Sequence, residues 1–338
     1  MILLVLLGVR SHVVADRLHV VFGAAAIPHP AKVAKGGEDA FFFDDSHGTF
    51  GVADGVGGSA SAEVDPGAFS REMLKRCHDV ACGGEEQEEA SRRSLVDTLG
   101  QVADQGLVSG GSSTLLLGQL EASSDPTGST RTLRLLNLGD SGAMILRPAW
   151  RTFRRGGKQL WPRIVLRTQD QQHFFNCPYQ ADADSFGSVG HQADKLCADV
   201  QDGDIFIAAT DGVLDNLFDP ALQVLVARSL PGLREKDPLA AQTAVDALAK
   251  VIAEQANAAG LREDDPELRT PFMVAAAQEG LQFAGGKLDD VAVVCGVVRC
   301  GEAPPQRVGH NFGSGELGDV RGVVVSTASR SAVTAKKY

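Results

Sequence analysis

Four short apolar segments of the chain each meet aspartate at one end. Residues 50–53, 133–138 and 205–210 run into Asp54, Gly139-Asp140 and Asp211, and residues 291–298 follow Asp289-Asp290. Short apolar runs that are rich in β-branched residues and bounded by glycine and aspartate are typical of buried strands. One such aspartate is usually a turn residue. Four of them suggest that carboxylates from distant segments meet at one edge of a sheet.

Four Asp-Pro or Thr-Pro pairs mark expected helix starts, because the first residue caps the helix and proline fits its first turn. The pairs are Asp65-Pro66, Asp219-Pro220, Asp237-Pro238 and Thr270-Pro271. In the first half of the chain, strands are followed by other strands rather than by regular crossover helices. This order favours a mixed or antiparallel sheet over a doubly wound parallel one.

The candidate carboxylates would need a cation if they meet. They are Glu38, Asp39, Asp54, Asp140, Asp211, Asp289 and Asp290. Without a cation, their repulsion and desolvation would destabilise the fold by about several kcal/mol. Mg²⁺ and Mn²⁺ prefer oxygen ligands, and two such ions that share a carboxylate can activate water and hold a phosphoryl group. The spacing alone leaves a two-metal site and a set of ordinary turn aspartates equally open.

The charge balance excludes one large class of function. Lys and Arg together number 32 against 43 Asp and Glu, which gives a formal net charge of −11. A nucleic-acid-binding protein needs cationic surface to displace phosphate counterions, so we expect no nucleic-acid partner. An anionic substrate would have to be met by a local device such as a bound cation. The six cysteines include no Cys-x-x-Cys pair, and we expect reduced thiols.

Six stretches of the chain resemble, in order, the motifs of the metal-dependent Ser/Thr phosphatases, the protein phosphatase 2C family. They are GGEDAFF (36–42), FGVADGVGG (50–58), GSSTLLL (111–117), LLNLGDSG (135–142), DIFIAATDGVLDN (204–216) and GGKLDDVAVV (285–294). Each Asp-Gly alone is a weak signal, whereas six motifs in order are specific. Residues 65–73 and 171–180 further resemble one eukaryotic branch of the family, whose members are often organellar.

The resemblance implies a fold and a reaction. The fold is α+β, a four-layer αββα sandwich of two antiparallel β-sheets flanked by helices, with the metal site at one edge. The reaction is hydrolysis of phosphoserine and phosphothreonine in a phosphoprotein substrate, by direct attack of a water that bridges two Mn²⁺ or Mg²⁺ ions. A catalytically weak or silent regulator on the same fold is the alternative, although none of the metal carboxylates that such a regulator usually loses is missing here.

The resemblance also implies roles for individual residues. Glu38 and Asp39 would serve the first ligand segment, directly or through water, and Asp54 would bridge both metals. The Gly55 carbonyl would complete one coordination shell, Asp211 and Asp289 would hold the other metal, and Asp140 would be an outer ligand for a weaker third ion. Residues 112–114 are expected to pack and hydrogen-bond beneath the site, since no base accompanies them as nucleophiles.

The chain departs from the family pattern at two positions. Many members have a histidine directly after Asp-Gly as the general acid for the leaving alkoxide, and here that position is Val56. The resembled branch also lacks this histidine, so Val56 does not indicate a dead enzyme. The family's phosphate-binding arginine is also not at its usual spacing. The nearest cations are Lys35 and Lys32, of which Lys35 is the candidate phosphate ligand, and for both an ordinary solvated lysine is the alternative.

The chain divides into three parts by composition and motif. Residues 1–22 are interpreted as an N-terminal segment, either a remnant of a targeting sequence or a stray strand. Residues 23–300 are the expected phosphatase domain, and residues 301–338, rich in Gly, Ser, Pro and Ala, are expected to be a disordered tail. The apolar run at residues 1–9 is half the length that a membrane span needs, so no span is predicted. We expect an intracellular monomer, and a mitochondrial or chloroplast location is consistent with the resembled branch.

Overall fold

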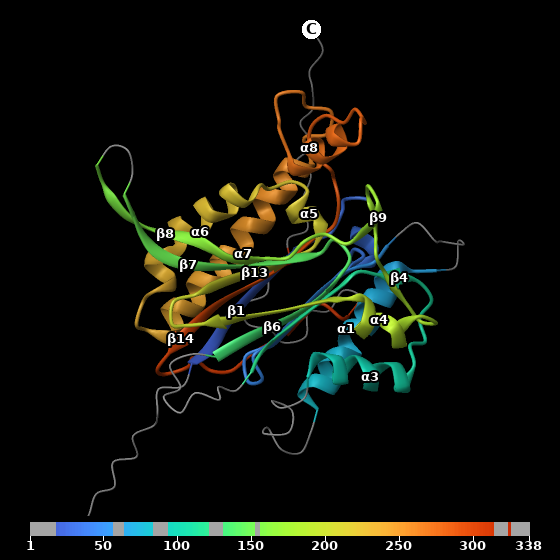
Figure 1. Cartoon of the computed structure of the whole chain (residues 1–338), viewed down its shortest axis with the longest axis horizontal. Helices are drawn as coiled ribbons and strands as arrows, with labels where there is room; N and C mark the ends of the chain where they lie inside the picture. Colours follow the sequence, from blue (N-terminus) through green and yellow to red (C-terminus); the bar gives the residue numbers. More distant parts are fainter. Residues whose placement is uncertain are drawn as a thin grey trace, which may run out of the picture.

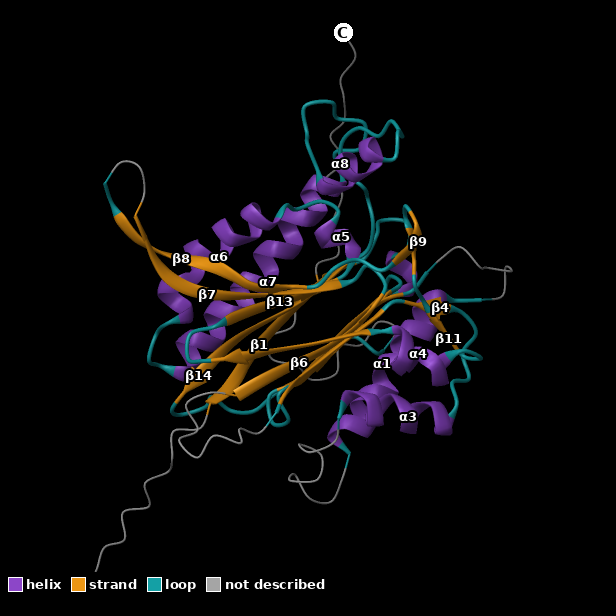
Figure 2. Ribbon diagram, viewed as in Figure 1, coloured by secondary structure: helices purple, strands orange, loops and turns teal. Residues whose placement is uncertain are grey.

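The computed structural model describes residues 18–56, 64–83, 94–121, 131–152, 156–313 and 324–325. Within these residues two six-stranded sheets face each other, and helices cover the outer face of each sheet (Figures 1 and 2). The expected four-layer αββα sandwich is therefore confirmed. Every pair of neighbouring strands in the two sheets is antiparallel except for the two-residue pairing of β16 with β1, which is parallel.

The two sheets are named here by their strands in spatial order. The first sheet consists of β16 (Val324–Val325), β1 (Leu18–Ile27), β14 (Val291–Cys300), β13 (Ile205–Ala209), β7 (Gly142–Thr152) and β8 (Lys158–Arg167). The second sheet consists of β12 (Asp194–Val200), β6 (Arg131–Leu138), β5 (Leu115–Leu120), β3 (Thr49–Asp54), β2 (Asp39–Asp44) and β15 (Val308–His310). Two short ladders pair β4 (Ser112–Ser113) with β11 (Ala181–Asp182) and β9 (Gln172–Phe174) with β10 (Cys177–Pro178).

The helices begin close to the predicted positions. They are η1 (Val33–Lys35), α1 (Pro66–Cys82), α3 (Leu95–Gln105), η2 (Phe186–Ser188), α4 (Val189–Gln192), α5 (Asp211–Leu214), α6 (Asp219–Leu233), α7 (Pro238–Gly260) and α8 (Pro271–Gln278). The side chains of Asp65, Asp237 and Thr270 accept hydrogen bonds from backbone amides of the first turns of α1, α7 and α8. Asp219 differs from the expectation, because it is the first residue inside α6 and not the cap.

Three apolar cores hold the four layers together. One lies between the first sheet and helices α6 and α7, one lies between the two sheets, and one lies between the second sheet and helices α1 and α3. Strand β2 shows how alternation builds two of them: Phe41 and Phe43 face the first sheet, whereas Phe42 faces α1. Phe50 of the second sheet stacks on Phe206 of the first with ring centroids 4.6 Å apart, which joins the sheets directly.

Paired strands extend beyond both expected boundaries of the domain. Strand β1 begins at Leu18, five residues before the predicted start at Gly23, and pairs along its full length with β14. Residues 301–313 are ordered against the domain rather than disordered, because β15 pairs with β2 and the Arg307 amide donates to Asp45 Oδ2 at 3.0 Å. Residues 1–17, 314–323 and 326–338, which carry the rest of both predictions, lie outside the described residues.

The six cysteines all lie in described segments, and Cys77, Cys82, Cys177, Cys197 and Cys295 are free thiols. None of the helices in the described segments is long and apolar enough to cross a membrane.

Candidate functional site

The strand ends bring the predicted aspartates together at one edge of the sandwich. Asp39 opens β2 and Asp54 closes β3, and the two are directly paired across the strands. One residue separates Asp140 from the end of β6, and one separates Asp211 from the end of β13. Asp289 likewise lies one residue before the Asp290 that precedes β14. Burial first, and then the charges of the other four aspartates, raise the pKa of Asp54, so each of the four is near enough to act on its carboxylate. The sequence-based expectation of a common edge is therefore met in this structure.

Asp54 rests on the hydroxyl-rich segment that was expected beneath the site. The Asp54 amide donates to Thr114 Oγ1 at 3.0 Å, and Ser113 Oγ donates to the Asp54 carbonyl at 2.8 Å. Gly55 follows where chain segments crowd together: a Cβ there would lie 2.5 Å from the Pro66 carbonyl oxygen and 2.9 Å from the Glu38 carbonyl oxygen. These contacts fix the backbone around Asp54 and require glycine at the next position.

Burial and mutual repulsion perturb the carboxylates. Burial first, and the neighbouring charges second, raise the pKa values of Asp39 and Asp54 well above the ordinary range for aspartate. The same two causes raise the pKa of Asp140 to about 7 and that of Asp289 to about 6. Burial and repulsion therefore outweigh the neighbouring lysine charges, which act to lower the pKa values of Asp140 and Asp289.

Three carboxylate oxygens are left for a cation. Oδ1 of Asp39, Asp140 and Asp211 are buried and accept no hydrogen bond from the described residues. Their partner oxygens are occupied: Thr210 Oγ1 donates to Asp39 Oδ2 at 2.7 Å, and Gln172 Nε2 donates to Asp140 Oδ2 at 3.2 Å. Buried oxygens without donors, drawn from several segments, fit a hard divalent cation such as Mg²⁺ or Mn²⁺.

Lys287 is a member of the site that the sequence analysis did not identify. Its Nζ lies 2.5 Å from Asp211 Oδ2, 2.7 Å from Asp215 Oδ2 and 3.7 Å from Asp289 Oδ2. Burial opposes the charge on Lys287, but the surrounding carboxylates outweigh it and raise the pKa of the ammonium group well above its usual value. The sequence did contain one indication of a cation here. Asp211 begins the short helix α5 and Asp215 directly follows it, and this four-residue spacing places two carboxylates on one side of a helical turn.

The two lysine candidates for phosphate binding lie in different environments. Lys35, at the end of η1, is exposed. Lys32 Nζ lies 2.5 Å from Glu38 Oε2, 2.9 Å from Asp290 Oδ2 and 3.9 Å from Asp289 Oδ1. Of the two candidate lysines, Lys32 is therefore the one whose ammonium group lies at the carboxylates.

Asp290 organises the backbone beside the first ligand segment. Its Oδ1 accepts from the His29 amide at 2.7 Å, and its Oδ2 accepts from the Glu38 amide at 3.2 Å. The Asp290 side chain is 2% exposed and its oxygens are occupied by these donors and by Lys32. We therefore interpret Asp290 as a positioning residue behind Glu38, distinct from the open carboxylates.

A cavity of about 340 Å³ opens beside Asp140 and adjoins Asp215. Its walls combine apolar side chains with Arg167 and Asp170. The apolar members are Leu214, Leu217, Phe218, Pro220, Pro271 and Ala275. This cavity is the space next to the carboxylates that could receive residues flanking a reacting group.

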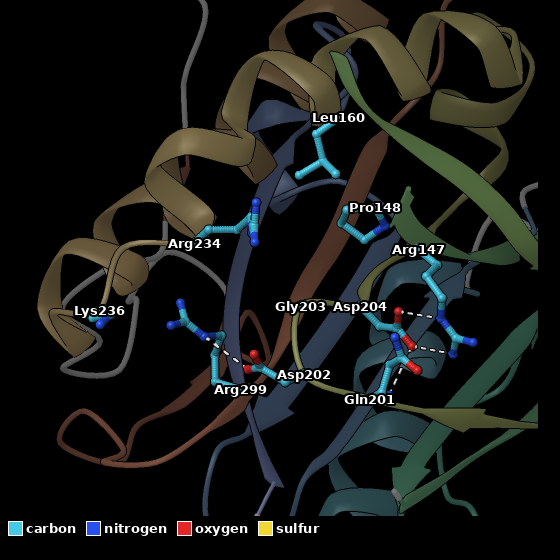
Figure 3. A pocket seen from close by; sticks show the side chains of 10 residues that line it. All are labelled: Arg147, Pro148, Leu160, Gln201, Asp202, Gly203, Asp204, Arg234, Lys236 and Arg299. Carbon is cyan, nitrogen blue, oxygen red and sulfur yellow. Dashed lines mark hydrogen bonds and ion pairs between the residues drawn. The ribbon is translucent and has the colours of Figure 1, made fainter. Parts of the chain in front are cut away.

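A second cavity of about 300 Å³ lies at the opposite end of the first sheet, where β13 begins and β14 ends (Figure 3). Arg147 and Arg299 line it and pair with Asp204 and Asp202, at 2.7 Å and 3.6 Å (Figure 3). None of the predicted site residues lines this cavity. The carboxylate edge is therefore the candidate active site.

Comparisons with known proteins agree with this geometry. No model of a known protein family matches the chain. The chain is 33% identical over 282 residues to probable protein phosphatase 2C 80 of Arabidopsis thaliana, covering 83% of this chain and 59% of that protein. It is 33% identical over 271 residues to the protein phosphatase PTC7 homolog of Danio rerio, covering 78% of this chain and 81% of that one.

A solved structure shares the fold over the same extent. The X-ray structure of the photosystem II phosphatase PBCP matches with a TM-score of 0.64 and 26% identity, covering 83% of this chain and 99% of that chain. Some of the curated relatives are longer, and the chain spans little more than half of their length, 59% and 54% for two Arabidopsis thaliana proteins.

Proposed function

Because the chain belongs to the protein phosphatase 2C family, we propose that it is a metal-dependent enzyme that hydrolyses phosphoserine and phosphothreonine in proteins. The observation that carries the proposal is the set of buried carboxylate oxygens without hydrogen-bond donors at Asp39, Asp140 and Asp211. Sequence likeness gives the class of reaction, and these oxygens supply an independent reason for divalent cations.

The proposed ligand set is the one that the resemblance to the family implies. Glu38, Asp39, Asp54, Asp211 and Asp289, with the Gly55 carbonyl, would hold two Mn²⁺ or Mg²⁺ ions, and Asp140 would serve a weaker third ion. Bound in this way, such ions activate water and neutralise the charge of a phosphoryl group. Direct attack by water, without a covalent intermediate on the protein, is the mechanism that this site favours. The hydroxyl groups of Ser113 and Thr114 are engaged in hydrogen bonds to the backbone of Asp54, and that of Ser112 donates to Gln180 Oε1.

Lys32 is proposed as the phosphate-orienting cation in place of Lys35. Its ammonium group lies beside Glu38 and Asp290 at the margin of the carboxylate cluster. An ammonium group there can donate to a phosphate oxygen once cations have taken over the neutralisation of the carboxylates. The cavity beside Asp140 would then receive side chains that flank the phosphorylated residue, with apolar walls at Leu217 and Phe218 and a guanidinium at Arg167.

The leaving alkoxide still needs a proton, and Val56 cannot provide it. A positioned acid typically accelerates such a step by about 10²–10⁴-fold. The Val56 amide donates to the Ser112 carbonyl at 2.9 Å, so the backbone at this position is held within the site. Water within the metal site is the proposed proton source in the absence of a histidine.

A silent regulator on the same fold is the second candidate. The retained carboxylates count against it, because they raise each other's pKa values and would have no use without cations. The two candidates are separated by hydrolysis of p-nitrophenyl phosphate by metal-stripped protein. We expect activity with Mn²⁺, none with EDTA, and no loss after iodoacetamide treatment. Absence of activity with every divalent cation would favour the regulator, and EDTA-resistant, iodoacetamide-sensitive activity would point to a cysteine enzyme instead.

Location and assembly are proposed on the resemblance to the organellar branch of the family. We expect a monomer in a mitochondrion or a chloroplast. Fluorescence microscopy of the tagged full-length gene product and sedimentation of the purified protein test the two proposals separately. A diffuse cytosolic signal would contradict the first, and a dimer at micromolar concentration would contradict the second.

A further inference from the structure

A second group of metal-binding side chains lies away from the carboxylates. Asp44 ends β2, the strand that Asp39 begins, so the two are separated by the length of the strand, about 17 Å at about 3.3 Å per residue. Asp44, His47 and Cys82 each offer one ligand atom, and these three atoms lie within 4.8 Å of one another. Asp44 is the last residue of β2, His47 lies in the turn between β2 and β3, and Cys82 is the last residue of α1.

A fourth donor, His78 of α1, lies beside this group. His78 precedes Cys82 by four residues, a spacing that places both on one face of the helix. His78 Nε2 lies 3.5 Å from Asp44 Oδ2, and His47 Nδ1 lies 3.0 Å from Asp44 Oδ1. Asp44, His47 and Cys82 therefore form the close group, and the imidazole of His78 lies beside it, near the Asp44 carboxylate.

The separations suit a tetrahedral ion. Bonds of about 2.0–2.3 Å to zinc place neighbouring ligand atoms about 3.3–3.8 Å apart. The two measured imidazole–carboxylate separations lie near this range, so small side-chain movements would complete the site. Imidazole and thiolate donors favour zinc-like ions, whereas the oxygen donors of the catalytic carboxylates favour Mg²⁺ or Mn²⁺.

Each of the two imidazoles has one buried nitrogen atom that could bind a metal ion. His47 Nδ1 and His78 Nε2 are both buried, and neither makes a well-aligned hydrogen bond with any described residue, despite the nearby Asp44. Behind the second ring, Asp79 Oδ1 lies 3.5 Å from His78 Nδ1. A carboxylate behind a ligating imidazole orients the ring and fixes its tautomer in metal sites.

The remaining ligands are also held in place. Asp44 Oδ1 accepts hydrogen bonds from the amides of Ser46 and His47 at 2.8 and 3.0 Å, which orients the carboxylate. Cys82 Sγ lies 3.2 Å from Thr49 Oγ1. The last turn of α1 carries no basic residue, and the negative end of its dipole would favour a cation near Cys82.

We propose that Asp44, His47, His78 and Cys82 form a structural site for Zn²⁺ or a similar ion that fastens the β2–β3 turn to the end of α1. Such an ion would link two elements that both contribute to the catalytic edge, since β2 begins at Asp39 and β3 ends at Asp54. The competing interpretation is a hydrogen-bonded turn beside a helix end, with no affinity for metal.

Cobalt binding to the metal-stripped full-length protein distinguishes the proposed metal site from a hydrogen-bonded turn without metal affinity. Co²⁺ bound by Cys82 gives a thiolate-to-metal charge-transfer absorption, which the oxygen ligands of the catalytic site cannot produce. We expect this band in the wild type, its loss on addition of Zn²⁺, and a higher melting temperature with Zn²⁺ than without metal. Absence of the band in the wild type would overturn the proposal.

Variants assign the band to these residues. Cys82→Ser should abolish the charge-transfer band, and His47→Gln should weaken Co²⁺ binding by at least about 10-fold. The control is Cys197→Ser, which changes an exposed thiol on β12 and should leave the band intact. Circular dichroism of each metal-free variant checks that the fold is kept. A band that persists in Cys82→Ser would contradict the site. Hydrolysis with Mn²⁺ should be unchanged in Cys82→Ser, so the result stands apart from the proposed phosphatase activity.

Discussion

Removal of one carboxylate from the catalytic edge should stabilise the metal-free protein while destroying its activity. The change is Asp54→Asn, which keeps the shape of the side chain and removes its charge. Burial and the charges of Asp211, Asp39, Asp289 and Asp140 all raise the pKa of Asp54. The asparagine variant escapes that repulsion.

The expected gain follows from the strand register. Asp54 is directly opposite Asp39, so the two side chains start about 5 Å apart. At an effective dielectric constant of about 20, two unit charges at that distance repel by about 3 kcal/mol. Partial protonation of the pair reduces this, and we expect a gain of about 1–3 kcal/mol. In a domain of this size about 2 °C corresponds to 1 kcal/mol, so the melting temperature should rise by about 2–6 °C.

The assay is thermal unfolding at pH 8 in buffer freed of metal by chelation, followed by the same scan with Mn²⁺. Asp194→Asn, which removes an exposed charge on β12, is the matched control and should change little. Asp211→Asn should not show the same gain, because it breaks the 2.5 Å contact with Lys287. Mn²⁺ should stabilise the wild type more than Asp54→Asn. A melting temperature for Asp54→Asn at or below that of the wild type, without metal, would refute the reasoning.

Three further predictions concern pH, phosphate and the leaving group. The pKa values of Asp140 and Asp289 are raised to about 7 and about 6, so the stability that their protonated forms contribute is complete below about pH 4 and is lost as the pH rises to about 7. Metal-free protein should thus melt lower at pH 8 than at pH 5, and Mn²⁺ should remove this difference; a higher melting temperature at pH 8 without metal would contradict it. Lys32→Ala should raise KM for a phosphoserine peptide by about tenfold, and Lys35→Ala should leave KM unchanged. A higher KM in Lys35→Ala but not in Lys32→Ala would instead identify Lys35 as the phosphate ligand. Val56→His should speed hydrolysis of the peptide by up to about tenfold. Hydrolysis of p-nitrophenyl phosphate, which has a good leaving group, should be nearly unchanged when the variant and the wild type have equal metal content. Equal effects on both substrates would argue against a missing acid.

The parts of the structure that were predictable depend on local pattern. The apolar runs around residues 50–53 and 205–210 became β3 and β13, because their composition and bounding residues suit strands wherever the chain places them. Asp65 caps α1 as expected, since capping involves only the next few amides. The common edge of the carboxylates was predictable for a similar reason: each aspartate stands at the same kind of boundary, where a strand meets a turn.

The structure differs from the sequence-based expectations where contacts between distant segments decide the arrangement. Leu18 joins the domain because it pairs with Cys300, and β15 is ordered because it pairs with β2, and neither contact is visible in local composition. Lys32 reaches the carboxylates rather than Lys35 because its ammonium group meets Asp290, 258 residues later in the chain. Lys287 contacts Asp211 in the same way, across 76 residues.

The dephosphorylation rate of a phosphoserine peptide, measured as Mn²⁺ is titrated into metal-stripped protein, tests the central claim most directly. Wild-type protein should be inactive without metal and should gain activity as Mn²⁺ is added, and EDTA should reverse the gain. Asp54→Asn should remain at least about three orders of magnitude slower at every Mn²⁺ concentration, because both of the proposed ions would depend on that carboxylate. Activity that needs no metal, or an Asp54→Asn variant that keeps a tenth of the wild-type rate, would contradict the account.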